Sequence, residues 1–279
     1  MSTSVTTFEP PPTHDRFTRS DRVQHAVMAL SFLVLAVTGL PQKFLYRDLG
    51  LVDVAIDLLG GIELVRVVHR IAATVLMAVM VFHVLDVAYR IVVRRVSLSM
   101  LPRYQDLLDA FHSLRFNLGL AKQGPRMDRY TWEEKVEYWS LVWGTMVMIV
   151  TGFMLWNPIA TARFLPGEFI PAAQVVHGGE ALLAVLAVLI WHFYSVHLRH
   201  FNRSMFTGEL SAHEMEAEHP LELERIRAGA HLAATPAEIA HRARVFLPIA
   251  GLMALLLLAG IYWFVTFEHT AITTLPAVR

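Results

Sequence analysis

The chain has 279 residues, 55% of them hydrophobic, and its 24 Lys and Arg residues balance its 24 Asp and Glu residues. Zero net charge says little about partners, and we expect no nucleic acid among them. Because the chain has no cysteine, disulfides, Cys-ligated iron–sulfur clusters and covalently attached c-type haem are excluded, and any electron transfer must use a histidine-ligated cofactor.

Five apolar stretches each approach or exceed the ~20 residues that a membrane-spanning helix needs. They are residues 23–40, 67–93, 138–156, 174–198 and 245–267. Lipid offers no partners for backbone polar groups, so such stretches predict an all-α integral membrane protein. We expect a four-helix bundle followed by a fifth, C-terminal transmembrane helix, with the first helix ending at Gly39-Leu40-Pro41.

Positive charge is divided unequally between the connecting segments. Most of the 24 Lys and Arg residues lie in 1–22, 94–137 and 199–244, and few lie in 41–66, 157–173 and 268–279. The positive-inside rule therefore predicts five spans of a bacterial-type inner membrane, with the N-terminus inside and the C-terminus outside. The predicted organisation is a cytoplasmic segment 1–22, a bundle domain 23–200 containing the basic cytoplasmic loop 94–137, a charged cytoplasmic segment 201–244, and a last helix with a short outer tail, 245–279.

The second and fourth apolar stretches each carry a histidine near either end. On an α-helix, His69 and His83 are separated by about 21 Å of rise and about 40° of rotation. His177 and His192 are separated by about 22 Å of rise and about 60° of rotation. Ionisable side chains at membrane depth are costly and usually functional, so this spacing indicates two metal centres stacked across a membrane.

With the predicted topology, His69 and His177 share the outer membrane depth, while His25, His83 and His192 share the inner one. Neutral imidazole is a common axial ligand of haem iron, and two per haem give a six-coordinate centre that transfers electrons. The residues therefore predict two b-type haems in the bundle and leave three inner histidines for two positions. Arginines near the ligand ends suit haem propionates or ordinary interfacial snorkelling; they include Arg70 outside and Arg199 inside.

The pattern resembles the di-haem cytochrome b subunits of membrane-bound formate dehydrogenases, with the related cytochromes b of nickel–iron hydrogenases and thiosulfate reductases. The resemblance covers roughly residues 16–220. It is carried by these motifs: DRVQH with His25, VRVVHR with His69, EKVEYWSLVWGTMVMIVTGFMLW, VVHGGEALLAVLAVLIWHFY with His177 and His192, and MFTGELSAHEMEAEHP.

The resemblance implies an outer haem on His69 and His177 and an inner haem on His25 and His192. It also implies a quinone site, for menaquinone or ubiquinone, beside the inner haem. The residues that would border this site are Tyr130, Thr131, Trp132, Glu133 and Lys135.

Three features depart from the formate dehydrogenase type. His83 has no counterpart there and looks like the paired-histidine helices of cytochrome b in quinol:cytochrome c reductases, which would make His83 and His192 the inner pair and leave His25 for a third role or a third haem. The spacing between His177 and His192 is one residue longer. The fifth helix and the longer inner loop are extra.

The expected function is a membrane-anchoring cytochrome subunit of a respiratory-chain oxidoreductase complex. It would pass electrons between the quinone pool and an extracytoplasmic iron–sulfur, hydrogenase or dehydrogenase, or multihaem cytochrome c subunit. Quinone chemistry needs a proton-transfer group, for which Glu133, Lys135, Asp86 and His83 are candidates. Two alternatives remain: a proton-coupled transporter that uses the histidines as a relay, and a stand-alone b-type cytochrome that oxidises or reduces quinone without a fixed partner.

Overall fold

The structure is a computed structural model that describes residues 13–45, 49–199, 201–229 and 234–266. Five helices in this part of the chain are long and apolar enough to cross a membrane: α1 (Arg19–Phe44), α3 (Ile62–Val92), α5 (Trp132–Trp156), α7 with its continuation (Phe169–Arg199) and α11 (Pro236–Thr266). The predicted all-α integral membrane fold is therefore confirmed. The predicted outer tail 268–279 lies outside the described residues.

The chain divides into two compact units. Unit 1 comprises Met1–Val23, Ser97–Glu137 and Phe201–Ala233, and unit 2 comprises Gln24–Val96, Tyr138–His200 and Ala234–Arg279. Unit 2 holds most of each spanning helix and all five histidines predicted to bind metal.

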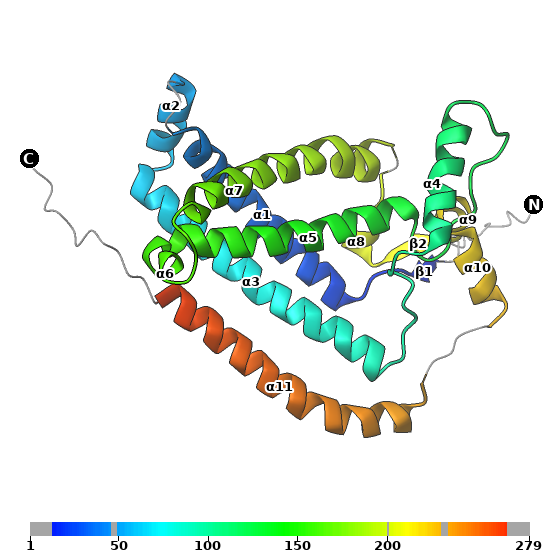
Figure 1. Cartoon of the computed structure of the whole chain (residues 1–279). Coiled ribbons are helices and arrows are strands. Elements are labelled where there is room, and N and C mark those ends of the chain that lie inside the picture. Colours follow the sequence, from blue (N-terminus) through cyan, green and yellow to red (C-terminus); the bar gives the residue numbers. More distant parts are fainter. Residues whose placement is uncertain (1–12, 46–48, 200, 230–233, 267–279) are drawn as a thin grey trace, which may run out of the picture. The chain divides into compact units, whose positions relative to one another are not determined.

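Four helices of unit 2 form an antiparallel bundle (Figure 1). Contacts between neighbouring helices join residues from opposite ends of their sequences: Gln24 with Asp86, Thr38 with His69, Tyr138 with His83, and Gly152 with His177. The backbones of these four helices lie well apart from one another. The side chains that join them are therefore long or polar rather than a close-packed apolar core.

The first helix extends further than the sequence predicts. It continues through Pro41 to Phe44 instead of ending at Gly39-Leu40-Pro41. Proline removes only one N–H donor near the end of a helix, so the last turn survives. The extension places Lys43 on the helix rather than in a loop.

The fourth spanning helix changes its winding partway along. α7 (Phe169–Leu186) passes into two π-helical segments, η1 (Ala187–His192) and η2 (Tyr194–Arg199). A π turn has i→i+5 hydrogen bonds and holds more residues than an α turn; such segments are rare and frequent at functional sites. The first π segment ends at His192, so the wide turns lie between His177 and His192.

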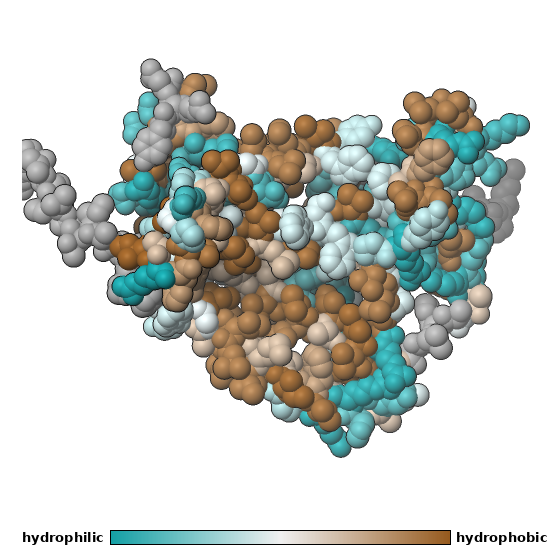
Figure 2. Space-filling model, viewed as in Figure 1, coloured by the Kyte–Doolittle hydropathy of each residue, from teal (hydrophilic) through white to brown (hydrophobic). Residues whose placement is uncertain are grey.

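The fifth helix, α11, runs beside α3 (Figure 1). Tyr89 of α3 meets Phe246 with ring centroids 5.8 Å apart, and Phe153 of α5 stacks on Phe264 at 4.6 Å. The rest of α11 exposes leucines such as Leu255, and Figure 2 shows hydrophobic side chains along much of this helix and hydrophilic ones at its N-terminal end. An exposed apolar surface of this kind suits contact with lipid.

Short helices connect the spans in unit 2: α2 (Gly50–Leu58) lies between α1 and α3, and α6 (Pro158–Ala162) lies between α5 and α7.

Unit 1 is built from three separate stretches of the chain. Strand β1 (Thr13–Asp15) pairs antiparallel with β2 (Glu209–Ser211). Around them lie α4 (Tyr104–Asn117), α8 (Ser204–Thr207), α9 (Ala212–Glu218) and α10 (Pro220–Arg227). Its small apolar core consists of Leu210, Met215 and Leu223 with Ile226 against them.

Candidate metal centres

One candidate centre lies where α3 and α7 bring His69 and His177 together. The centroids of their imidazole rings are 6.4 Å apart, and the ring planes are inclined by 66°. Each ring has the same kind of partner. Nδ1 of His69 lies 2.9 Å from Oγ1 of Thr38, and Nδ1 of His177 lies 2.9 Å from Oγ1 of Thr151.

The two threonines set the tautomer of both imidazoles. Thr38 Oγ1 donates to the carbonyl of Val34 at 2.6 Å, and Thr151 Oγ1 donates to the carbonyl of Val147 at 2.7 Å. Because each hydroxyl proton is used in this way, the hydroxyl oxygen accepts from the imidazole Nδ1–H. The Nε2 lone pair of each ring is then available to a metal, which is the arrangement that supporting hydrogen bonds impose on ligating histidines.

Two glycines make room for these rings. A Cβ added at Gly39 would lie 3.0 Å from Cε1 of His69, and one added at Gly152 would lie 3.4 Å from Cε1 of His177. Each glycine follows one of the supporting threonines, so the sequence Val-Thr-Gly occurs on α1 and again on α5. This repeat was a usable signal that we did not interpret from the sequence.

A second candidate centre lies at the other end of the bundle, where α1 presents His25 and η1 presents His192. Their ring centroids are 6.3 Å apart and their planes are inclined by 35°. His192 is the last residue of the first π segment. The change of winding therefore directly precedes the residue that faces His25.

Both separations fit a haem iron between the rings. A ring centroid lies about 1.1 Å from Nε2, so two imidazoles with metal–nitrogen bonds of about 2.0 Å place their centroids about 6.2 Å apart. The wide spacing of the four helices leaves room for a flat macrocycle. In the described residues, no group of three or more His, Asp or Glu side chains could hold a bare metal ion.

His83 lies beside Gln24 and Tyr138. Its Nδ1 is 2.9 Å from Oε1 of Gln24, and its Nε2 is 3.0 Å from the hydroxyl oxygen of Tyr138. Both ring nitrogens are therefore engaged in hydrogen bonds, in contrast to the arrangement at His69 and His177.

Several polar groups surround the His69–His177 centre. The guanidinium of Arg70 lies 4.9 Å from the ring centroid of Trp156. Nε1 of Trp156 is buried and makes no hydrogen bond within the described part of the chain. Nζ of Lys43 lies 3.0 Å from the position of a Cβ added at Gly178, the neighbour of His177. Lys43 was not predicted as a site residue because the first helix was expected to end before it.

Glu180 was also missed. Its Oε1 would lie 2.6 Å from a Cβ at Gly144, so Gly144 makes room for a carboxyl group on the helix that carries His177. Arg199, which was predicted to bind a propionate, ends η2, and its side chain is exposed.

The residues predicted to border a quinone site are firmly held within unit 1. Thr131 caps α5: its Oγ1 accepts from the N–H of Glu134 at 3.2 Å, and its own N–H donates to that carboxylate at 2.8 Å. Nζ of Lys135 lies 2.6 Å from Oδ1 of Asp106. Nε1 of Trp132 donates to Oγ of Ser113 at 3.1 Å.

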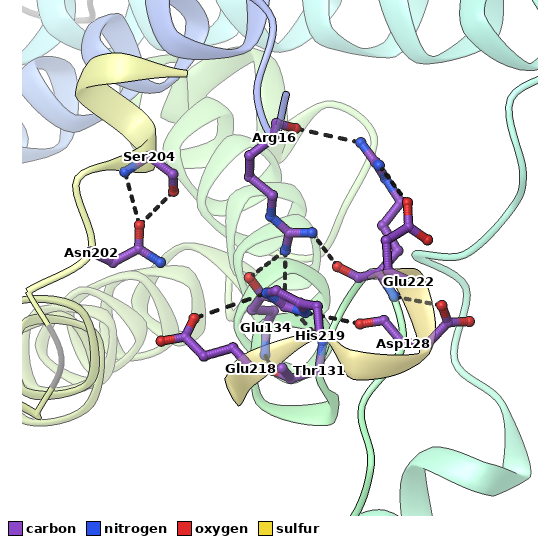
Figure 3. Close-up of polar contacts among 10 residues, drawn as sticks. Arg16, Asp128, Thr131, Glu134, Asn202, Ser204, Glu218, His219 and Glu222 are labelled. Carbon is purple, nitrogen blue, oxygen red and sulfur yellow. Dashed lines mark hydrogen bonds and ion pairs between the residues drawn. The ribbon is translucent and has the colours of Figure 1, made fainter. Parts of the chain in front are cut away.

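Arg16 and His219 lie at the centre of a buried polar cluster in unit 1 (Figure 3). The guanidinium of Arg16 donates to Oε1 of Glu134 at 2.9 Å and lies over the ring of Tyr130. Nδ1 of His219 donates to the backbone carbonyl of Asp128 at 2.9 Å. Burial, and then the charge of Arg16, lower the pKa of His219 below its usual value.

Known proteins resemble this chain over the same region. The family described as prokaryotic cytochrome b561 matches residues 16–208. A formate dehydrogenase subunit of Escherichia coli K12, the nitrate-inducible cytochrome b556(Fdn) subunit, is 20% identical over 201 residues, which cover 72% of this chain and 85% of the relative. The cytochrome b556(fdo) subunit of the same organism is 19% identical over 208 residues, which cover 74% of this chain and 89% of the relative.

Proposed function

The chain belongs to the prokaryotic cytochrome b561 family, and from that membership we propose that it carries electrons across a membrane through two b-type haems. One haem would be held by His69 and His177 and the other by His25 and His192. The observation that carries this proposal is the pair of ring separations, 6.4 and 6.3 Å, at opposite ends of one bundle. A haem held by two imidazoles supplies one-electron chemistry and has no open iron position for a substrate.

His69 and His177 are prepared to act as ligands before the haem arrives. Thr38 and Thr151 hold the proton of each imidazole on Nδ1 and fix the ring orientation. Such supporting hydrogen bonds increase the basicity of a ligating imidazole and secure its position.

The assignment of His25 rather than His83 to the second haem rests on two supports. The ring of His25 is at the separation from His192 that one iron needs. His83 already engages both of its nitrogens, with Gln24 and Tyr138, so ligation would require it to break a hydrogen bond. We therefore propose two haems rather than three.

Propionate groups of the haem at His69 and His177 would meet Arg70, Trp156 and Lys43. A propionate oxygen would satisfy the buried Nε1–H of Trp156, which makes no other hydrogen bond among the described residues. Arg70 and Lys43 would supply the opposite charge. Arg199 is a matching candidate for the haem at the other end.

We further propose that electrons are exchanged with menaquinone or ubiquinone beside the His25–His192 haem. Tyr130, Thr131, Trp132, Glu133 and Lys135 would border the quinone, as the family resemblance implies. The excess of Lys and Arg in alternate segments supports placing this end of the bundle in the cytoplasmic half of the membrane. The similarity to formate dehydrogenase subunits supports a dehydrogenase as the partner, which we propose to act at the other, extracytoplasmic end. An iron–sulfur, hydrogenase or multihaem cytochrome c subunit is the alternative partner.

Haem counting on single variants of the purified protein tests the proposal. We expect the wild type to bind two haems per chain, with b-type absorbance. His25→Ala and His192→Ala should each lose one haem, and His69→Ala and His177→Ala should each lose the other. His83→Ala is the matched control and should keep both. A chain without b-type absorbance, or loss of a haem in the control instead of in His25→Ala, contradicts the assignment.

A further inference from the structure

A chain of hydrogen bonds joins α5, α3 and α1 at the His25–His192 end of unit 2. The hydroxyl of Tyr138 lies 3.0 Å from Nε2 of His83, whose Nδ1 lies 2.9 Å from Oε1 of Gln24. Nε2 of Gln24 donates to Oδ2 of Asp86 at 3.0 Å, and Arg90 donates to the same oxygen at 2.6 Å. Polar groups cost free energy at membrane depth, so five joined in sequence indicate a function.

Which group donates and which accepts in each of these hydrogen bonds follows from the Asp86–Arg90 pair at one end of the series. The carboxylate of Asp86 pairs with Arg90 and accepts hydrogen bonds from its neighbours. The amide nitrogen of Gln24 must therefore face Asp86, which turns its oxygen toward His83. Nδ1 of His83 then carries a proton, and in the neutral ring Nε2 accepts a hydrogen bond from the hydroxyl of Tyr138.

The same contacts also accommodate a charged His83. With a second proton, Nε2–H donates to the oxygen of Tyr138, because a phenol hydroxyl both donates and accepts. Nδ1–H continues to donate to Gln24, which is 4% exposed and held in place by Asp86. Both protonation states therefore keep all of their hydrogen bonds, and only the hydroxyl of Tyr138 turns.

Gln24, the middle member of this series of hydrogen bonds, directly precedes the proposed iron ligand His25 in the sequence. Building on the proposed function, we infer that His83 takes up one proton when one electron arrives at the His25–His192 centre, and releases it when the electron leaves. An added negative charge favours a positive charge nearby in a low-dielectric surrounding. One electron, supplied by the quinol or by the external redox partner, and one proton, supplied by water, enter together, so the net charge at this end stays constant.

The other charged groups around His83 are paired or already assigned. On α3, Asp86 and Arg90 form an ion pair of 2.6 Å. On α11, which packs against α3, Arg242 lies 3.5 Å from Glu238. On α5, Tyr138 is the titratable residue that contacts His83. The other imidazoles at this end are the proposed ligands His25 and His192, and His197, whose ring lies 5.2 Å from that of Phe193.

Redox titration of each haem in the intact protein tests this inference, over roughly pH 5 to 9, the range in which histidine charge changes. Haem content and absorbance are measured first, and the haem missing from His25→Ala identifies the relevant signal. The potential of this haem should fall with pH, by up to about 59 mV per pH unit, the value of a tenfold change for a one-electron couple. The potential of the other haem should be nearly independent of pH, because threonines support its ligands.

Two variants complete the test. His83→Gln should keep both haems and lose the slope. Tyr138→Phe should keep both haems and move the pH at which the slope begins. An unchanged slope in both variants, or an equal slope for the two wild-type haems, overturns the inference while the haem assignment stands. Loss of a haem in His83→Gln would overturn it by making His83 a ligand, and absence of haem from the wild type would overturn the proposed function as well.

Discussion

The two ends of unit 2 support their histidine pairs in different ways. At the His69–His177 end, each ring donates to a threonine and lies against a glycine, so two helix pairs repeat one design. At the His25–His192 end, the winding of the fourth spanning helix changes, and the neighbouring polar groups are His83, Tyr138 and Asp86. Hydroxyl groups of threonine do not titrate, whereas imidazoles do near neutral pH. A similar ring separation is thus found once with threonine supports that do not titrate, and once at the end of unit 2 that also carries His83, to which we assign the proton uptake.

The substitution that we expect to be most damaging lies at a glycine of the repeated Val-Thr-Gly sequence. Gly39→Val places a branched side chain where even a Cβ would lie 3.0 Å from the ring of His69. We expect the ring to be displaced and one haem per chain to be lost, as measured by haem content and absorbance. Gly251→Val on α11, where nothing lies within 4 Å of the added Cβ, is the control and should keep both haems. Retention of two haems in Gly39→Val would contradict the close-approach role of this glycine.

The π segment offers a way to break the other end. Inserting one alanine after Leu186 turns His192 by about 100° away from His25, so we expect one haem to be lost. Deleting Leu189 instead shortens the spacing between His177 and His192 by one residue, to the spacing expected for the formate dehydrogenase type, and this variant should keep both haems with an ordinary α-helix. An alanine inserted after Leu255 in the exposed part of α11 is the control. Equal haem loss after insertion and deletion would show that the π turns do not serve to position His192.

The supporting threonines should tune the haem rather than hold it. Thr38→Val keeps the shape of the side chain but removes the acceptor for His69 Nδ1–H, so the imidazole becomes a weaker electron donor to iron. We expect both haems to remain and one midpoint potential to rise by about 59 mV, equivalent to the tenfold effect typical of such supporting bonds. Thr151→Val should act on the same haem through His177.

The matched control for these threonines is Thr145→Val. Thr145 is buried on α5 and makes no hydrogen bond to a histidine in the described part of the chain. Two results would contradict a shared support by the threonines. One is a shift of the midpoint potential in this control as large as in Thr38→Val. The other is a shift of different haems in Thr38→Val and in Thr151→Val.

How much of this could be predicted from the sequence differs between the two ends. The five spans followed from length and hydropathy, because these alone decide whether a helix crosses a membrane. His69 and His177 were expected together, and the structure brings them together. At the other end, His25, His83 and His192 competed for two positions. Spacing could not decide between them, because an ideal α-helix does not anticipate the π turns before His192.

Contacts between helices could not be predicted from the sequence, for a different reason. The Val-Thr-Gly repeat was present in the sequence, but its meaning depends on which helix faces which. Lys43 was overlooked because Pro41 suggested that the first helix ends early. In unit 1, Arg16 lies 118 residues along the chain from Glu134, and His219 lies 91 residues from Asp128. The sequence surroundings of Arg16 and His219 are those of ordinary polar loops.

The prediction with the smallest expected effect concerns the pH dependence of stability in unit 1, which we expect to be independent of the pH dependence of the haem potential in the bundle. The pKa of His219 is lowered in the folded state, so the unfolded state binds more protons at pH values just below 6.5, the usual value. The contribution of His219 to stability is therefore complete above that pH and declines as the pH falls through it, toward the lowered value. We expect hydrogen exchange of α9 and α10 to become faster in this window.

His219→Asn keeps a donor at the position of Nδ1 for the carbonyl of Asp128 but has no charge to gain. In this variant the exchange rates of α9 and α10 should vary less with pH, while the pH slope of the haem potential stays as in the wild type. Because His83→Gln should have the opposite pattern, the two variants together assign each pH response to its own histidine. A change of the haem slope in His219→Asn would show that unit 1 contributes to the proton uptake that we assign to His83.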